Sequence, residues 1–337
     1  KISIEKNLIY KSLSHVQSIV EKKNTIPILS HILLEATDSS LVLSATDMDI
    51  SITETINCSV IEKGSATVSA HTLYDIVRKI PDGNEIEFIA NDGKKFSIRS
   101  GKSKFSLSCL PKEDFPLITI DKLNCEFSLN SNVFLKLIEK TKFAISNEET
   151  RYFLNGIYFH KKSLDNIDFL SLVATDGHRL AKIDLSHPEG LVDLPGVIIP
   201  KKTIFELCKL LPDMNEDIII NVDPNKIIFY IDKIVLISKL IDGNFPDYQR
   251  VIPQNNNNIV IADRQKFCEA VDRVSTITSE KSRAIKFRLL NNLINLNSSD
   301  PEHGTATEDV PVQYEGEEIE IGFNSKYILE MINQLEE

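Results

Sequence analysis

Several features that mark metal-binding, membrane and secreted proteins are missing from this sequence. No two cysteines form a Cys-x-x-Cys pair, which argues against a zinc site or a thioredoxin-like motif. We expect all five to be reduced residues packed in the core: Cys58, Cys109, Cys125, Cys208 and Cys268. No apolar run approaches the roughly 18 residues of a membrane span, and residues 1–10 lack the apolar core of a signal peptide. We therefore expect a cytoplasmic protein.

Catalytic and cofactor-binding motifs are missing as well. The sequence has no Gly-x-Ser-x-Gly elbow, His-Glu-x-x-His pair, Walker A loop or Gly-x-Gly-x-x-Gly turn. It also has no zinc finger and no aromatic RNA-binding motif, which argues against recognition of a specific nucleic-acid sequence. We expect no enzymatic activity, no cofactor and no metal ion.

The balance of charge is acidic. Asp and Glu number 49 against 38 Lys and Arg, which gives a net charge of −11. Taken alone, this total argues against a nucleic-acid partner. A ring-shaped molecule can, however, be acidic outside and basic inside, so the positions of the lysines matter more than their number.

The chain contains three copies of one unit. Ala45-Thr46-Asp47 recurs as Ala174-Thr175-Asp176, and a weaker third copy ends at Asp300. Other landmarks recur at nearly the same offset, namely residues 81–85 at 212–216 and Phe115-Pro116 at Phe245-Pro246. These shifts indicate homologous units of roughly 125 to 130 residues. We place the three domains at residues 1–122, 123–252 and 253–337.

Each unit is expected to contain two helices and several strands. Apolar residues at i, i+3, i+4 and i+7 predict short helices around residues 9–20, 73–80, 134–141, 204–211, 267–274 and 328–335. A short strand precedes each helix, at residues 1–5, 65–70, 125–130, 196–200, 259–262 and 318–323. The half-unit is therefore βαβββ. Two half-units make an α+β domain with two helices on one side of its sheets.

The third unit is expected to be incomplete. By comparison with residues 81–122, roughly 40 residues that would finish it are missing after Glu337. We therefore expect the third domain to lack its C-terminal part.

Basic residues occur on the predicted helices, opposite the apolar stripes. Lys136 and Lys140 lie one turn apart on the third helix, and Lys201 and Lys202 lie at the fourth. Short helices of this kind could line a hole and cross DNA grooves, so that the lysines contact phosphates without reading sequence. Ordinary solvated helix faces give the same pattern, so the lysines alone leave both interpretations open.

Three specific motifs lie in the second and third units. They are Arg-Tyr-Phe-Leu-Asn-Gly at 151–156, Ala-Thr-Asp-Gly-His-Arg-Leu-Ala at 174–181 and Phe-Pro-Asp-Tyr-Gln-Arg-Val at 245–251. With further matching stretches along the whole chain, they make it resemble the bacterial β sliding clamp family, the processivity subunit of DNA polymerase III. The resemblance implies three tandem DNA-clamp domains and a head-to-tail homodimeric ring around duplex DNA. It also implies that the ring tethers the replicative polymerase, the clamp loader and other clients during DNA replication.

The resemblance implies a subunit interface between the first domain of one chain and the third domain of the other. The matching positions are Lys102, Lys104, Phe105 and Leu107 on the first domain and Ile277, Glu302 and Glu308 on the third. An edge strand would find its ladder partner in the other chain, and pairing of the lysines with the glutamates would fix the register.

The resemblance also implies a pocket for short client motifs with apolar and glutamine anchors. The matching positions are Arg151, Leu154, Thr175, Gly177, His178, Arg179, Leu180, Pro246, Arg250 and Val251. The apolar members would form a floor, Gly177 would let a client main chain approach closely, and Arg151 and Arg250 would supply donors at the rim. The family's C-terminal tail forms one wall of this pocket, and we expect that wall to be missing here.

For DNA contact, the positions that match the family are Lys23, Tyr152, Phe153, Lys201, Lys202 and Arg250, to which the helix pattern adds Lys136 and Lys140. Family members often carry a tyrosine where this sequence has Phe153. That difference removes one hydroxyl contact but leaves stacking possible.

Other functions are compatible with parts of the sequence. Asp176 beside His178 could be a catalytic base with its orienting partner, although the first copy lacks the histidine. Asp47 and Asp49 could ligate magnesium in a metal-dependent nuclease or phosphatase. The simpler alternative is that these residues form turns. A repeat scaffold that binds proteins but not DNA would share the threefold repeat.

Overall fold

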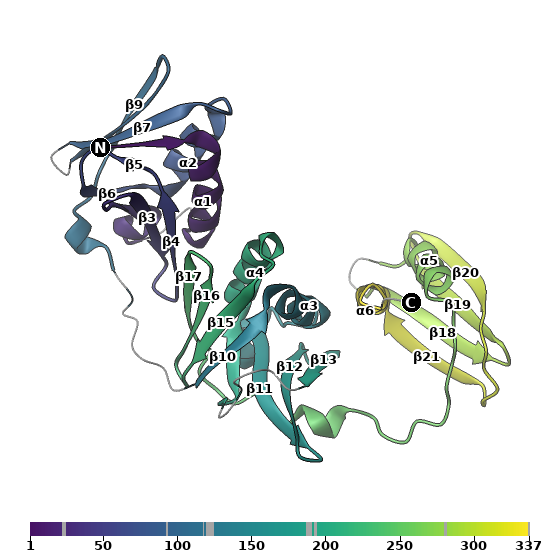
Figure 1. Cartoon of the computed structure of the whole chain (residues 1–337). Coiled ribbons are helices and arrows are strands. Elements are labelled where there is room, and N and C mark those ends of the chain that lie inside the picture. Colours follow the sequence, from purple (N-terminus) through teal and green to yellow (C-terminus); the bar gives the residue numbers. More distant parts are fainter. Residues whose placement is uncertain are drawn as a thin grey trace. The chain divides into compact units, whose positions relative to one another are not determined.

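The computed structural model describes residues 1–21, 25–91, 94–116, 118, 125–186, 191, 194–279 and 282–335. The chain divides into two compact units, Lys1–Asn244 and Phe245–Glu337, and each is described by itself (Figure 1). The first unit contains the first and second sequence repeats. The second unit contains the third repeat and the connection that precedes it.

The predicted helices are all present. Their bounds are α1 Lys6–Ile19, α2 Ala70–Lys79, α3 Ser131–Lys142, α4 Lys201–Leu210, α5 Arg264–Ser275 and α6 Ser325–Ile332. Three of them begin with a side chain that accepts a hydrogen bond from a main-chain amide of the first turn: Asn130, Asp263 and Asn324. Within the described ranges, no helix is long and apolar enough to cross a membrane.

The strands follow the predicted order in the first two repeats. The first repeat contains β1 Ile2–Glu5, β2 His31–Ala36, β3 Ser40–Thr46, β4 Ile50–Asn57, β5 Ser59–Val60, β6 Gly64–Ser69, β7 Glu85–Asn91, β8 Lys95–Ser100 and β9 Ser103–Ser108. The second contains β10 Cys125–Asn130, β11 Gly156–Leu164, β12 Ile167–Thr175, β13 Leu180–Ser186, β14 Val197–Pro200, β15 Asp217–Val222, β16 Lys226–Ile231 and β17 Ile234–Lys239. Apart from the short extra β5, each half-unit is βαβββ, which confirms the predicted α+β class.

The third repeat differs at its start. Its strands are β18 Ala284–Leu290, β19 Leu293–Asp300, β20 Gly304–Pro311 and β21 Ile319–Asn324. The predicted strand at 259–262 is wrong, because only Ile261 forms a bridge, with Gln313. In the first two repeats the opening strands β1 and β10 pair with the strand that follows the second helix, β7 or β15. Among the described residues no strand follows α6, so residues 259–262 have no such partner.

One sheet joins the first two repeats. Its strand order is β10-β15-β16-β17-β4-β3-β2-β6, and β17 of the second repeat pairs with β4 of the first. One continuous apolar core contains residues of both repeats, including Leu43 and Leu236. Helices α1 and α4 also contact each other. The two repeats therefore form a single compact unit, which the sequence did not predict.

The repeated Thr/Ser-Asp motif forms the same turn three times. In each copy the aspartate Oδ1 accepts hydrogen bonds of 2.8 to 3.0 Å from main-chain amides two and three residues later: Asp47, Asp176 and Asp300. The next residue in the first two copies, Met48 or Gly177, has a positive φ of 80° or 86°. Such turns are typical of aspartate, whose short side chain bonds to the following main chain.

Four of the five cysteines behave as expected. Cys125 belongs to the core of the first unit, and Cys58, Cys109 and Cys208 pack against it. Burial raises the pKa of these last three thiols, which disfavours the reactive thiolate. Cys268 is only partly buried, and all five are free thiols.

Candidate functional site

The turn between β12 and β13 carries a group of the predicted client-binding residues. Thr175 ends β12 and Leu180 begins β13. The Thr175 hydroxyl donates to the Arg179 carbonyl at 2.7 Å and accepts from the Gly177 amide at 3.1 Å. The turn is therefore held by its own side chains, and it exposes Gly177 and His178.

Arg179 ties this turn to the end of α3. Its Nε lies 3.1 Å from Asp176 Oδ2, and its Nη2 donates to the Phe143 carbonyl at 2.5 Å. The guanidinium carbon lies 5.3 Å from the Phe143 ring centroid. The Asp176 carboxylate thus accepts hydrogen bonds from main-chain amides of the turn and from the Arg179 side chain. This arrangement supports the turn-forming alternative for Asp176 over a catalytic pairing with His178.

Arg151 lies against Gly177. It belongs to the short 3-10 segment Glu149–Leu154, and its Nε donates to Glu148 Oε2 at 2.8 Å. A Cβ placed on Gly177 would lie 2.5 Å from Arg151 Nη1. Because Gly177 has no side chain, the Arg151 guanidinium can lie directly against its main chain. The main chain of a client was expected in that space.

The remaining predicted pocket residues differ in exposure. In the first unit, Leu154 is 3% exposed, so its side chain offers almost no surface to a partner, while Leu180 is half-buried. In the second unit, Pro246 is exposed and Val251 is 68% exposed. Arg250 lies in the same unit, and its Nε is 2.8 Å from Asp247 Oδ2.

Three predicted DNA-contact residues come together in the first unit. The Lys201 amide, at the start of α4, donates to the Asn155 carbonyl at 2.9 Å, next to the segment that carries Tyr152 and Phe153. The two rings pack edge to face with centroids 5.9 Å apart, and Tyr152 is 54% exposed. An exposed aromatic ring such as Tyr152 suits stacking, while the Lys201 ammonium bonds to the side-chain oxygen of Asn147.

Lys202 has a different environment from the one expected. Its ammonium bonds to the Asp47 carboxylate and donates to the Ile19 carbonyl at 3.1 Å, and Glu21 lies 3.8 Å away. All three partners belong to the first repeat, whereas Lys202 belongs to the second. The charge of Lys202 is thus used within the protein, where it joins the two repeats. This role was missed because no local pattern reveals a partner so distant in sequence.

The other predicted DNA lysines lie on α3. Lys136 is exposed and Lys140 half-buried, while Phe134, Leu137 and Ile138 on the opposite side of the helix are buried. Lys23 lies outside the described residues.

The acidic residues considered for a metal site have other partners. Asp47 bonds to Lys202, and Asp49 lies 3.1 Å from Lys239 Nζ. Across the described residues, no group of three or more His, Cys, Asp or Glu side chains is placed to hold a metal ion.

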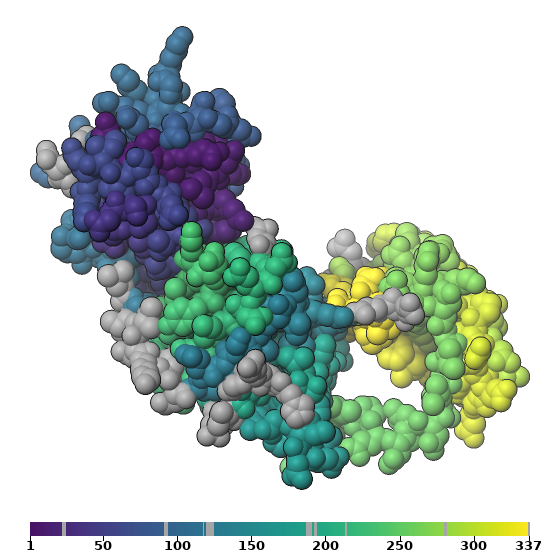
Figure 2. Space-filling view, viewed as in Figure 1, coloured from purple at the N-terminus to yellow at the C-terminus, as the bar shows by residue number. Residues whose placement is uncertain are grey.

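Two strands with residues of the predicted subunit interface lie at sheet edges. β9 is the last strand of the sheet β5-β1-β7-β8-β9, and β20 is the last strand of the sheet in the second unit. The β8–β9 hairpin projects from the surface of the first unit at the top of Figure 2. Lys102 and Lys104 are exposed and Phe105 is 38% exposed, while Leu107 packs partly on the core.

On the third repeat, the predicted interface residues surround β20. Glu308 lies on this strand and Glu302 in the turn before it, while Ile277 follows α5 and is half-buried. The Arg273 guanidinium bonds to Glu308 at 2.6 Å and lowers the pKa of that carboxyl. Glu308 is thus already paired within its own chain, so a lysine of another subunit would have to compete with Arg273.

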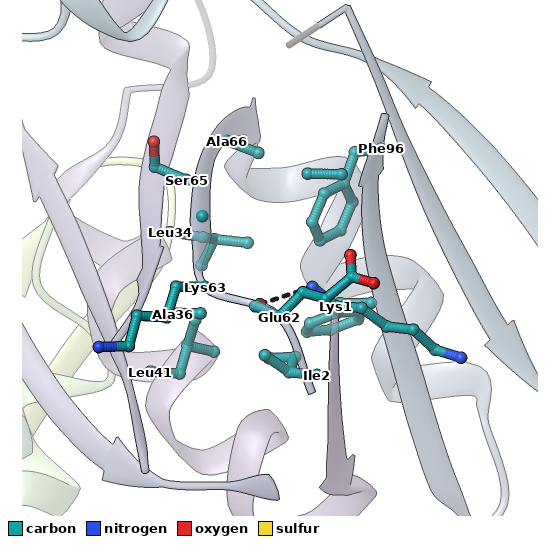
Figure 3. A pocket seen from close by; sticks show the side chains of 13 residues that line it. Lys1, Ile2, Leu34, Ala36, Leu41, Glu62, Lys63, Ser65, Ala66 and Phe96 are labelled. Atoms are coloured by element: carbon teal, nitrogen blue, oxygen red, sulfur yellow. Dashed lines mark hydrogen bonds between the residues drawn. The ribbon is translucent and has the colours of Figure 1, made fainter. Parts of the chain in front are cut away.

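A separate cavity of about 200 Å³ lies in the first repeat. Its lining includes the apolar side chains of Leu34, Phe88 and Phe96, and the main-chain nitrogen of Lys1 donates to the Glu62 carbonyl at 2.8 Å (Figure 3). None of the predicted site residues contributes to its lining.

The repeats correspond to three domain families. Residues 1–119 match the N-terminal domain of the DNA polymerase III beta subunit, residues 128–247 its central domain and residues 249–337 its C-terminal domain. The chain belongs to the beta sliding clamp family. The three tandem clamp domains predicted from the sequence are thereby confirmed.

Individual relatives agree with this assignment. The Beta sliding clamp of Caulobacter vibrioides is 46% identical over 336 residues, which cover 99% of this chain and 90% of the relative. A solved sliding clamp from Bartonella birtlesii, bound to griselimycin, is 45% identical in sequence and superposes with a TM-score of 0.97. The match covers 100% of this chain and 90% of the Bartonella chain. The DNA polymerase III beta subunit of Pseudomonas aeruginosa is 33% identical with a TM-score of 0.92, over 99% of this chain and 90% of its own. The family is non-catalytic, so the chain is a DNA replication clamp subunit and not an enzyme.

Proposed function

We propose that two copies of this chain form a head-to-tail ring that encircles duplex DNA and confers processivity on the replicative polymerase. The observation that carries the proposal is the clamp architecture, in which edge strands β9 and β20 lie in the first and third repeats. An edge strand presents unpaired amides and carbonyls, and pairing β9 of one chain with β20 of another would satisfy them. Because different surfaces of the two chains meet, the interface is heterologous, and we propose that it closes into a ring after two chains instead of extending as a filament.

We propose Lys102, Lys104, Phe105 and Leu107 as one half of this interface and Ile277, Glu302 and Glu308 as the other. Their positions on or beside the two edge strands support the assignment. Glu302 is the better electrostatic partner for the lysines, because Arg273 already binds Glu308.

For DNA, we propose that Lys136, Lys140, Tyr152, Phe153, Lys201 and Arg250 contact the duplex without reading its sequence. Lys23 and Lys202, which the family resemblance also implies, complete the proposed set. We expect Lys202 to contribute least, because three acceptors surround its ammonium.

For client proteins, we propose a pocket that takes short linear motifs with apolar and glutamine anchors. Its residues are Arg151, Leu154, Thr175, Gly177, His178, Arg179, Leu180, Pro246, Arg250 and Val251. The polymerase and the clamp loader would use this pocket, and a tethered polymerase would rebind at high effective concentration after each release. We further propose a cytoplasmic location and domain boundaries near residues 122 and 252.

A topological experiment tests the central claim. The protein is loaded onto nicked circular DNA by a purified clamp loader with ATP and then passed through a sizing column in high salt. We expect the protein to stay with the circle and to be lost when a restriction enzyme linearises the DNA, because an encircling ring slides off free ends. Equal retention on circular and linear DNA would contradict encirclement and favour ordinary surface binding.

A further inference from the structure

Gly177 is exposed to solvent, but an arginine from another segment covers the side of its main chain on which a Cβ would stand. Gly177 has a φ of +86°, in the left-handed region that favours glycine. The Arg151 guanidinium occupies the space where a Cβ would stand, at 2.5 Å from Nη1. No other residue type at this position would leave room for the guanidinium.

Glu148 holds the guanidinium in this place. Its Oε2 accepts from Arg151 Nε at 2.8 Å and lies 2.7 Å from Nη2. Its carbonyl also accepts the Arg151 amide at 3.3 Å, and Arg151 departs from helical geometry, with φ −114° and ψ 51°. Both the main chain and the side chain of Arg151 are therefore positioned by Glu148.

The contact is particular to the second repeat. The equivalent turn of the first repeat has Met48 where the second has Gly177, with a φ of +80°. Met48 therefore carries a Cβ where Gly177 carries none. The glycine and the arginine thus occur together in the copy that carries the proposed client residues.

We propose that Glu148 is a positioning residue that keeps Arg151 over Gly177, so that a client must displace this arginine before its main chain can reach the glycine. The inference rests on the proposed client-binding function of the turn. In the closed arrangement, two of the three guanidinium nitrogens face Glu148 and the third lies against Gly177. Opening would uncover the glycine and free donors for the carbonyl groups of an extended peptide.

The size of the effect follows from exposure. The side chains of Glu148 and Arg151 are 50% and 37% exposed, so solvent screens their attraction. Exposed ion pairs of this kind are weak. The apparent affinity for a client falls only in proportion to the fraction of molecules that are in the open, binding-competent state. We expect removal of the Glu148 charge to tighten client binding about two- to fivefold.

The test uses the full chain and a fluorescein-labelled pentapeptide that carries one glutamine followed by leucine and phenylalanine anchors. Fluorescence anisotropy gives the Kd for the parent protein and for Glu148→Gln, which keeps the side-chain shape but removes the charge. The matched control is Glu139→Gln, since Glu139 forms a similar i,i+3 pair with Lys142 and is 54% exposed. The Nε–Hε signal of Arg151 in ¹⁵N NMR reports directly whether the guanidinium is released.

The expected result is a lower Kd for Glu148→Gln, an unchanged Kd for Glu139→Gln, and faster solvent exchange of the Arg151 Nε proton only in the first variant. A Kd that is unchanged or higher in Glu148→Gln overturns the positioning role, while the client pocket stands as long as the parent protein binds the peptide. If the parent does not bind the peptide, the proposed client function itself fails, and this inference fails with it.

Discussion

Single side chains show how far the role of a residue depends on partners distant in sequence. Lys202 looks like a DNA-facing lysine in the sequence, yet its ammonium bonds to Asp47 and the Ile19 carbonyl. Asp176 resembles a catalytic acid, yet it caps a turn and binds Arg179. In both cases the carboxylate satisfies donors that would otherwise be left without a partner in a partly buried place.

Replacing Lys202 should weaken the junction between the first two repeats. The Asp47 side chain is only 9% exposed, so Lys202→Ala leaves a nearly buried carboxylate without its cation. We expect a loss of about 1–3 kcal/mol in the free energy of unfolding, measured by urea denaturation. Lys201→Ala is the control, because the Lys201 ammonium bonds to the amide of Asn147 and neutralises no buried acid. Equal losses in the two variants would contradict the role assigned to Lys202.

Adding a methyl group at Gly177 should be costly. Gly177→Ala forces a non-glycine residue to a φ of +86° and places its Cβ against Arg151. We expect a loss of about 1–2 kcal/mol in the free energy of unfolding, together with weaker client binding. The measurement is thermal unfolding of the variant and the parent. Gly64→Ala, where a Cβ would meet nothing within 4 Å, should have a much smaller effect in the same measurement. A Gly177→Ala protein as stable as the parent would show that the turn relaxes easily.

Among the structural elements, the edge strands and α3 carry the clearest functional consequences. β9 and β20 each end a sheet, and α3 buries Phe134 and Leu137 while it exposes Lys136. The same amphipathic pattern that packs the helix on its sheet therefore leaves its basic side facing away from the core.

Charge reversal on β9 should weaken self-association. In Lys104→Glu, like charges would face the acidic residues near β20, and we expect the dimer Kd to rise at least about tenfold, measured by sedimentation equilibrium. Lys95→Glu is the matched control. Lys95 is also exposed, but it lies on β8, which is an inner strand between β7 and β9. A dimer that is equally tight in Lys104→Glu and in the parent would remove β9 from the interface.

Loss of a lysine on α3 should change the salt dependence of DNA binding. We expect Lys136→Ala to lower affinity for any duplex sequence and to reduce the slope of log K against log salt by about 1. Binding titrations at several salt concentrations provide the measurement. Lys233→Ala, in the exposed β16–β17 hairpin, should leave the slope unchanged. If both variants shift the slope alike, the contact is a general charge effect.

For the whole molecule, the family assignment and the edge strands together predict a closed assembly of two chains. With a chain mass of 38.0 kDa, light scattering after size exclusion should give twice this mass at micromolar concentration. Head-to-tail closure uses both edges of each chain, so the assembly should stop at the dimer without growing into filaments. A monomer under these conditions, or open-ended growth with concentration, would contradict the ring.

The threefold repeat, the helices, the βαβββ order and the Thr/Ser-Asp turns could all be predicted from the amino-acid sequence. These features depend on residues close in the chain, where periodicity and turn chemistry act locally. Tertiary structure alone decided that β17 pairs with β4, that Lys202 neutralises Asp47, that Arg151 covers Gly177 and that residues 259–262 form only a bridge. Each of these needs a partner that folding brings from elsewhere in the chain, and hydrogen-bonding and charge patterns do not specify which distant group that partner will be.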